Sequence, residues 1–182
     1  MSRGSRHLRD GMQVIVRPRT DADLEGCEQL ARVVHDLDGY PPYLPGDLRT
    51  FVAVPNAMAA WVAEVGSDLV GHVALHPDSS DAVMGCASEV TGQPPDRFGV
   101  IARLLVSPAA RREGIGLSLL DIATSHAVDR DLRPMLDVAT RFHGAIRLYE
   151  SCGWVRAGIV SVRLDTDFTL DEYVYLASPG AS

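Results

Sequence analysis

The sequence predicts an α/β fold in which a mixed, largely antiparallel central sheet is flanked by helices on both faces. Two observations favour this fold class. Runs of apolar and β-branched residues alternate along the chain with segments whose apolar residues recur at helical spacing. Some of the strand-like runs are joined by short turns, as antiparallel strands are, and others by helical segments, as parallel strands are. We therefore expect a strand, a helix, a short helix, three strands, a helix, a strand, a helix and two closing strands.

The first strand and helix follow a short N-terminal segment. Residues 12–18, "MQVIVRP", are strand-like, and Thr20 or Asp21 can cap a helix over residues 21–36. The next segment, "LDGYPPYLPGDL", is rich in proline and glycine and predicts a loop before a short helix near residues 47–52. Residues 1–11 are basic and show no periodicity, so we expect a flexible tail there.

The middle of the chain predicts a hairpin and a central strand. Two β-type runs in "AAWVAEVGSDLVGHVALHP" are separated by "GSD", which is typical of a tight hairpin turn. Residues 78–97 are polar and rich in turn formers, so we expect an irregular excursion between strands. "FGVIARLLVSP" then returns to β-branched residues and stops at Pro108, as a central strand does.

The C-terminal half continues the alternation of helices and strands. Apolar residues between positions 117 and 128 trace one helical stripe, and "MLDVA" predicts a short buried strand. A second helix over residues 145–151 ends near Gly153, which suits a left-handed cap. "WVRAGIVSVRL" and "DEYVYLAS" are typical of two closing strands, and we expect Trp61 and Trp154 in the core.

Composition narrows the classes of partner. A chain of 182 residues, 46% of them hydrophobic, can bury one sizeable core, so we expect a single domain over residues 12–182. The formal charge of −7 argues against general binding to nucleic acid or to an anionic membrane; it suits a cationic substrate or serves only solubility. The longest apolar run is too short to span a bilayer. Three scattered cysteines show neither a disulfide framework nor metal-ligand spacing, so we expect no metal site and a reduced, cytoplasmic protein.

The strand that stops at Pro108 leads through "ARREGIG" into a helix. This arrangement aims unpaired backbone N–H groups and the positive end of the helix dipole at the loop, where an anion is the natural ligand. Gly114 and Gly116 allow a diphosphate to approach the backbone closely, and Arg111 and Arg112 add positive charge. The loop lacks the lysine of a Walker loop and the third glycine of a dinucleotide fingerprint. The alternative interpretation is a glycine-softened turn with solvated arginines.

Two motifs resemble the GNAT superfamily of acyl-CoA-dependent N-acyltransferases. Arg111, Gly114 and Gly116 match its RxxGxG signature, and the preceding strand carries the matching "LLVSP" ending. Downstream, "AIRLYESCGW" is similar to the second segment of the same family, AxxLYxxxGF. The resemblance extends from Val14 to Ala177. It implies a GNAT-like fold, one N-acetyltransferase domain, and acetyl-CoA as the acyl donor substrate.

The resemblance also implies roles for individual residues. The end of the strand Arg103–Val106 would line the pantetheine arm, and a backbone N–H near Leu105 or Val106 would polarise the thioester carbonyl. Tyr149 would protonate the departing thiolate, with packing on the core as its alternative interpretation. Backbone amides of the loop would bind the pyrophosphate. The implied cofactor-binding set is Leu105, Val106, Arg111, Arg112, Glu113, Gly114, Ile115, Gly116, Leu117, Ser118 and Phe142.

Two departures from the family pattern affect the chemistry. Phe142 stands where many members carry an asparagine, so it packs against the cofactor or fills core instead. Residues 100–102, "VIA", occupy the strand positions where some members carry a carboxylate base. An attacking amine must still lose a proton. The candidates for the group that accepts it are Glu89, His72, His76, His143 or a water chain.

Tyr40 and Tyr43 lie in the proline-rich loop that borders the acceptor site in this family. We expect them to bind the acceptor amine, including by cation–π contact, or else to plug the loop. The implied reaction is direct acetyl transfer to a primary amine of a small molecule or a peptide, without nucleophilic catalysis by Cys152. The alternative is a non-catalytic acyl-CoA-binding regulatory module. Strand exchange or edge pairing by the C-terminal strands would make a homodimer.

Overall fold

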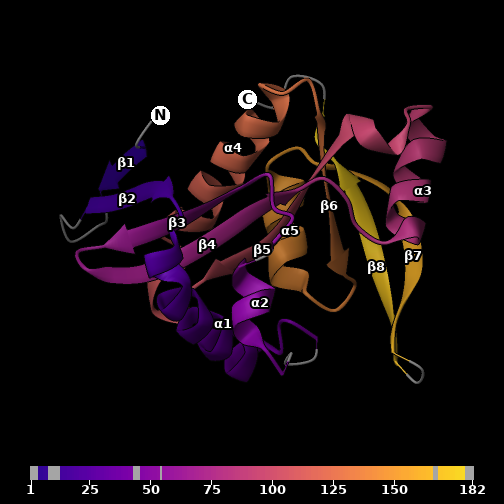
Figure 1. The fold of residues 1–182 in the computed structure, drawn as a ribbon. Coiled ribbons are helices and arrows are strands. Elements are labelled where there is room, and N and C mark those ends of the chain that lie inside the picture. Colours follow the sequence, from indigo (N-terminus) through magenta and orange to yellow (C-terminus); the bar gives the residue numbers. More distant parts are fainter. Residues whose placement is uncertain (1–3, 8–12, 43–45, 54, 166–167, 179–182) are drawn as a thin grey trace. The chain divides into compact units, whose positions relative to one another are not determined.

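The computed structural model describes residues 4–7, 13–42, 46–53, 55–165 and 168–178 (Figure 1). The chain divides into two compact units, residues 1–75 with 103–123 and residues 76–102 with 124–182. The prediction of a single domain stays a prediction. The elements, in chain order, are β1 (Gly4–His7), β2 (Gln13–Pro18), η1 (Asp21–Asp23), α1 (Leu24–Asp38), α2 (Leu48–Ala53), β3 (Ala59–Val65), β4 (Asp68–His76), α3 (Asp81–Thr91), η2 (Pro95–Arg97), β5 (Phe98–Val106), η3 (Pro108–Ala110), α4 (Ile115–Val128), β6 (Arg133–Ala139), α5 (His143–Ser151), β7 (Val155–Asp165) and β8 (Phe168–Leu176).

The first unit is built on antiparallel strands. β1 pairs with β2, β2 with β3, and β3 with β4. In the last pair Val62 lies opposite His72 and Ala63 lies opposite Gly71. Strand β1 falls within the segment that the sequence predicts as a tail, and residues 1–3 and 8–11 of that segment lie outside the described residues.

Helices cover both faces of this part of the sheet (Figure 1). Successive residues of a strand point to opposite sides, so the neighbouring residues Val62 and Ala63 mark the two faces. On the Ala63 face, the first turn of α4 packs against the strands. On the Val62 face, α1 and α2 bury an apolar cluster. The members of the cluster on α1 are the apolar residues whose helical spacing predicts that helix. The cluster consists of Leu24, Cys27, Leu30, Ala31, Val34, Leu48, Val52, Val62 and Leu105.

A glycine on β4 sets how closely α4 approaches the sheet. A Cβ atom added at Gly71 would lie 2.8 Å from Leu119 Cδ1 and 3.1 Å from both Ile115 Cγ2 and Ala63 Cβ. Carbon atoms in van der Waals contact are about 3.5–4.0 Å apart, so a side chain at this position would force its neighbours on α4 and β3 to move. Glycine at this position therefore lets the first turn of α4 lie directly on β4.

The second unit combines parallel and antiparallel pairing. β5 and β6 run parallel, β6 and β8 antiparallel, and β8 and β7 antiparallel. On one face of this sheet, α3 packs over Met135 and Val174. On the other face, Tyr149 of α5 contacts Tyr175 of β8. The prediction of a mixed, largely antiparallel sheet with helices on both faces is confirmed.

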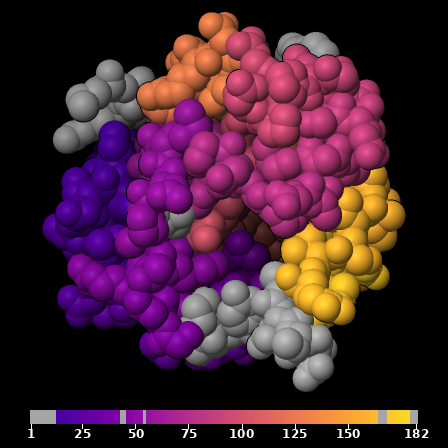
Figure 2. All heavy atoms as spheres, turned by 45° about the vertical axis from the view of Figure 1, so that its right-hand side comes forward, coloured from indigo at the N-terminus to yellow at the C-terminus, as the bar shows by residue number. Residues whose placement is uncertain are grey.

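The expectation of an irregular excursion over residues 78–97 is wrong for its central part, because residues 81–91 form helix α3. Ser80 caps the helix, since its Oγ accepts from the N–H of Val83 (3.4 Å), and the helix ends at Gly92 with φ 70°. Its buried side packs against β7 and β8; α3 is pink and the two strands are yellow in Figure 2. The sequence does not predict this helix because its buried apolar residues, Val83, Met84 and Ala87, are few. They lie among small and polar residues, a composition that is also typical of turns.

The three cysteines carry free thiols. Cys27 is fully buried in α1, and burial raises the pKa of its thiol to about 11, so it stays protonated and unreactive near neutral pH. In the described part of the chain, no helix is long and apolar enough to cross a membrane.

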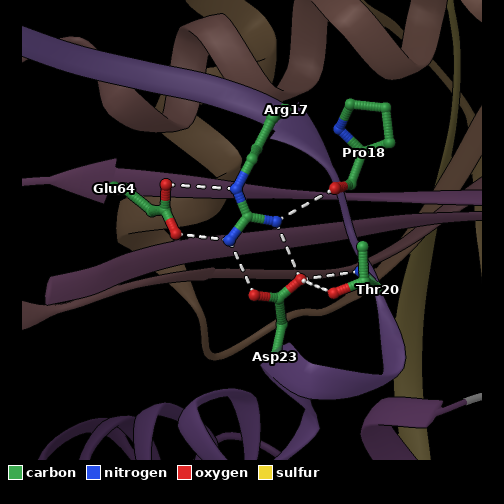
Figure 3. A network of polar contacts seen from close by, with 5 residues as sticks. All are labelled: Arg17, Pro18, Thr20, Asp23 and Glu64. Carbon is green, nitrogen blue, oxygen red and sulfur yellow. Dashed lines mark hydrogen bonds and ion pairs between the residues drawn. The ribbon is translucent and has the colours of Figure 1, made fainter. Parts of the chain in front are cut away.

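A network of charged side chains joins β2, β3 and the start of α1 (Figure 3). Arg17 lies between two carboxylates: Nη1 and Nη2 donate to both oxygens of Asp23 (2.8 and 2.7 Å), and Nε and Nη2 donate to Glu64. The N–H and hydroxyl of Thr20 also donate to Asp23 (2.7 and 2.8 Å). The Arg17 bonds are the main reason why the pKa of Asp23 lies well below its usual range.

We expect Asp23→Asn to lower the free energy of unfolding near pH 7 by about 1–3 kcal/mol, the usual contribution of hydrogen bonds to a charged group. Because the pKa of Asp23 is depressed in the folded state, its stabilisation is present above the ordinary aspartate pKa and is lost as the pH falls below it. The difference between wild type and variant should therefore shrink below about pH 4. Urea unfolding over this range measures the difference. Asp21→Asn, at an exposed neighbour, is the control, and equal losses in the two variants would contradict the prediction.

Candidate functional site

The loop after β5 turns the chain sharply from a strand into a helix. Pro108 begins the turn η3, and Arg112 and Gly114 then adopt left-handed φ values of 66° and 77° before α4 begins at Ile115. Glycine takes this conformation freely, whereas arginine does so at a steric cost. The N–H and the hydroxyl of Ser118 both donate to the carbonyl of Gly114 (3.0 and 3.1 Å). The N–H groups of residues 115–117 therefore have no acceptor within the helix.

These N–H groups make the start of α4 suitable for an anion. They lie at the positive end of the helix dipole, next to the exposed side chain of Arg112. Ile115 is buried and packs on the sheet, which fixes the first turn in place. The structure thus brings Arg112, Glu113, Gly114, Ile115, Gly116, Leu117 and Ser118 together in one turn, as the sequence predicts; their part in cofactor binding stays a prediction.

The side chain of Arg111 is held by two partners. Nη1 and Nη2 donate to the two carboxylate oxygens of Asp38, the last residue of α1, and Nε donates to the carbonyl of Val106 (3.3 Å). The loop motif gives no sign of Asp38, because that residue lies far from the motif in the sequence.

The residues expected to present a backbone N–H to a thioester lie at the end of β5. Leu105 is fully buried in the cluster with α1 and α2, and Val106 is half-buried. The N–H of Ser107 donates to the carbonyl of Val70 (2.8 Å), which holds the end of β5 against β4. Just before them, Arg103 adopts φ 53°, which is outside the extended range. The backbone of β5 is therefore irregular immediately before its last residues.

A partly buried network of hydrogen bonds holds this irregular point. His72, fully buried on β4, donates from Nδ1 to the carbonyl of Arg103 (3.0 Å), and Arg19 Nη1 donates to its Nε2 (3.4 Å). Arg103 Nε donates to the carbonyl of Phe51 (2.6 Å), and its guanidinium lies 4.8 Å from the centre of the Phe51 ring. Arg19 donates to the carbonyls of the last two residues of α2. Two arginines thus satisfy the last three carbonyls of this short helix.

His72 does not suit the role of base. Burial is the main reason why its pKa falls to about 4, and the nearby charges of Arg19 and Arg103 lower it further. The imidazole is therefore neutral near pH 7, and both of its nitrogens are engaged. The other candidates lie on three different elements: His76 is buried at the end of β4, Glu89 is exposed on α3, and His143 is exposed at the start of α5.

Tyr149 and Phe142 lie at α5 in the second unit. Tyr149 is 7% exposed, and its ring centre is 6.4 Å from that of Trp154 and 6.1 Å from that of Tyr175. Phe142 precedes the helix, with the guanidinium of Arg141 5.2 Å from its ring centre. The Tyr149 ring therefore packs in the core, and its role as an acid stays a prediction, as does cofactor contact by Phe142.

Of the two tyrosines expected at the acceptor, Tyr40 packs against the cluster formed by α1 and α2. Tyr43 lies outside the described residues. Next to Tyr40, the carbonyl of Pro41 accepts from His35 Nδ1 (2.9 Å), which ties the start of the loop back to α1.

Two carboxylates that the motifs do not include lie on one face of the strands of the second unit. Glu172 lies opposite Ala139, so Asp137, two residues along β6, is on the same face and diagonal to it. The hydroxyl of Ser79 donates to Asp137 (3.0 Å). Burial, and then the charge of Asp137, raise the pKa of Glu172 to about 7. In the sequence, strand alternation indicates only that each residue points to one face of its own strand. The register of β6 and β8 is needed to bring Asp137 and Glu172 together.

Comparisons with known proteins agree with the loop motif. The family model described as "Acetyltransferase (GNAT) family" matches residues 27–154. An N-acetyltransferase from Staphylococcus aureus Mu50 superposes with a TM-score of 0.68 at 16% identity, over 90% of this chain and 96% of that one. Arabidopsis thaliana NAA60 in complex with acetyl-CoA gives 0.67 at 19%, over 90% and 97% of the two chains. The ribosomal-protein-S18-alanine N-acetyltransferase from Escherichia coli gives 0.64 at 17%, over 90% and 92%. A comparison with curated proteins gives no match.

Glu172→Gln should make the stability of the protein less dependent on pH. The pKa of Glu172 in the folded state, about 7, lies above the ordinary glutamate value of 4.5. Between these values the folded state binds more protons than the unfolded state, so wild-type stability falls as the pH rises. The variant lacks this loss. Urea unfolding across the same range measures the effect, with Glu89→Gln on the exposed side of α3 as the control. Parallel stability curves for wild type and Glu172→Gln would refute the shift.

Proposed function

The chain belongs to the acetyltransferase (GNAT) family, and we propose that it transfers the acetyl group of acetyl-CoA directly to a primary amine of a small molecule or a peptide. One observation carries the proposal: the RxxGxG segment forms a loop that leads from the end of β5 to the first N–H groups of α4, which have no acceptor within the helix. Such a loop suits the diphosphate of CoA. Arabidopsis NAA60, which shares the fold, is described in complex with acetyl-CoA.

In this proposal the donor lies along the end of β5 and the loop. Backbone N–H groups of the loop and of residues 115–117 bind the diphosphate, and the last residues of β5 contact the pantetheine arm. The N–H of Leu105 or Val106 donates to the thioester oxygen. It stabilises the negative charge that develops there when the amine attacks, since a fixed donor needs no reorganisation during the reaction. Phe142 packs against the cofactor.

The transfer step forms one bond and breaks another. The amine nitrogen attacks the thioester carbon, a C–N bond forms, and the C–S bond of the tetrahedral intermediate breaks. The thiolate of CoA leaves and takes a proton from the Tyr149 hydroxyl, while the amine loses a proton to a base or to water. No covalent enzyme intermediate forms in this direct transfer, and Cys152 takes no part as a nucleophile.

For the base, the described side chains change the set of candidates. His72 is disfavoured because it is neutral and engaged at both nitrogens. Glu172 joins Glu89, His76, His143 and water, because its pKa of about 7 lies where a general base works best.

The acceptor that we propose binds as an ammonium group, which loses one proton to the base or to water before its neutral nitrogen attacks. The net charge of −7 supports a cationic acceptor, and Tyr40 and Tyr43 supply aromatic faces for it. The Escherichia coli enzyme with the same fold acts, by its name, on an alanine of a ribosomal protein.

The free thiols support a cytoplasmic location. Val155 and Ile159 are exposed apolar residues on β7, and they support a homodimer.

Gly114→Leu should abolish measurable CoA binding while the protein stays folded, because the side chain would enter the space between the backbone and the diphosphate. Gly92→Leu is a matched control: it has the same left-handed strain (φ 70°), opens into free space, and lies at the end of α3. Calorimetric titration with CoA and a thermal unfolding curve measure both effects. Unchanged CoA affinity in Gly114→Leu would reject the loop as the diphosphate site.

Tyr149→Phe should reduce kcat by about 10²–10⁴-fold with little change in CoA affinity, since it removes the proton donor and keeps the buried ring. Tyr173→Phe, a half-buried tyrosine of β8, is the control. Release of thiol from acetyl-CoA is measured against a panel of primary amines. An unaffected kcat would reject the acid role. Tight CoA binding with no turnover on any amine would instead favour the non-catalytic acyl-CoA-binding module.

A further inference from the structure

We propose that the Arg111 side chain positions the cofactor loop by binding Asp38, and that it does not itself bind the phosphates of CoA. The inference rests on the proposed function, in which the loop binds the diphosphate. It concerns the first unit alone, where α1, the end of β5 and the loop meet.

Arg111 uses all three nitrogens of its guanidinium: the two terminal nitrogens bind Asp38, and Nε binds Val106. Nη1 donates to Asp38 Oδ1 (3.1 Å) and Nη2 donates to Asp38 Oδ2, which is the two-pronged geometry that arginine forms with carboxylates. Nε donates at the same time to the carbonyl of Val106 (3.3 Å). One planar group therefore links the last residue of α1 to the last residue of β5.

Without Arg111, the negative charge of Asp38 would be unfavourable at its position in the helix. Asp38 ends α1, and the C-terminal end of a helix carries the negative pole of its dipole, which repels a carboxylate. Gly39 follows in a left-handed conformation and closes the helix with its N–H on the carbonyl of His35 (2.7 Å). Pairing with Arg111 offsets this repulsion, and it also neutralises the charge that Arg111 would otherwise direct at a phosphate.

The contact with Val106 gives the pair its effect on the loop. The carbonyl of Val106 and the N–H of Ser107 belong to one peptide group. Arg111 holds the carbonyl, and the carbonyl of Val70 holds the N–H (2.8 Å). The peptide plane at the end of β5 is thus fixed from both sides, directly after the N–H groups proposed to face the thioester. Loss of either Arg111 or Asp38 releases one side of that plane.

A double-mutant cycle on CoA affinity tests the proposal. Asp38→Asn, Arg111→Gln and the double variant are titrated with CoA by calorimetry, together with Arg111→Lys. Lysine keeps the charge but cannot make the two-pronged contact and the Nε bond together. Asp36→Asn, exposed on the same helix, is the control, and thermal unfolding confirms that each variant is folded.

We expect Asp38→Asn, Arg111→Gln and Arg111→Lys each to weaken CoA binding by about three- to tenfold, and the double variant to be no weaker than the weaker single variant. Three results would overturn the proposal: additive losses in the double variant, no loss in either single variant, or a loss in Arg111→Gln with unchanged or tighter binding in Asp38→Asn. The last result would mean that Arg111 contacts the phosphates directly. The Gly114→Leu titration tests the loop assignment separately, so a failure of this proposal can be told apart from a failure of the proposed function.

Discussion

The start of α4 can lie on the sheet because β4 has no side chain at position 71. Leu119 and Ile115 fill the space that a Cβ atom would need, and Ala63 lies on the same face beside them. This contact places the first turn of α4, and with it the N–H groups of residues 115–117, at a fixed height above β4. The loop between β5 and α4 must then bridge a short gap, which it does with left-handed residues at Arg112 and Gly114. The geometry of the proposed diphosphate site thus depends on a packing distance in the sheet.

On the opposite face of the same strands, two positive charges are partly removed from water. Arg19 and Arg103 both lie near a neutral imidazole that supplies no negative charge to either. Carbonyls at the end of α2 accept from both guanidiniums, and the face of Phe51 lies next to one of them. A helix end carries partial negative charge, and an aromatic face attracts cations, so both groups offset part of the charge of the two arginines. The irregular residue in β5 is held in place by the same bonds.

Much of the fold could be predicted from local patterns. The apolar stripe of α1, the hairpin around "GSD" and the proline after β5 each act within a few residues, and Trp61 and Trp154 are buried as expected. The loop could be predicted because its glycines and arginines are contiguous. Helix α3 could not, since Val83, Met84 and Ala87 form too short a stripe among small residues. Two pairs of charged residues could not be predicted either. The packing of α1 brings Asp38 to Arg111, and the strand register brings Asp137 near Glu172, so neither pair is visible before the fold is known.

The interleaving of the two units along the chain has a consequence for synthesis. Leu105 belongs to a cluster whose other members all lie between Leu24 and Val62, and residues 76–102 of the other unit separate them. The first core therefore cannot be complete until the ribosome has made Leu105, and most of the second unit is made later still. Contacts between residues so far apart along the chain form slowly. Neither unit can be produced as one continuous fragment, so nascent chains that stop early expose an unfinished apolar surface, the kind that chaperones bind.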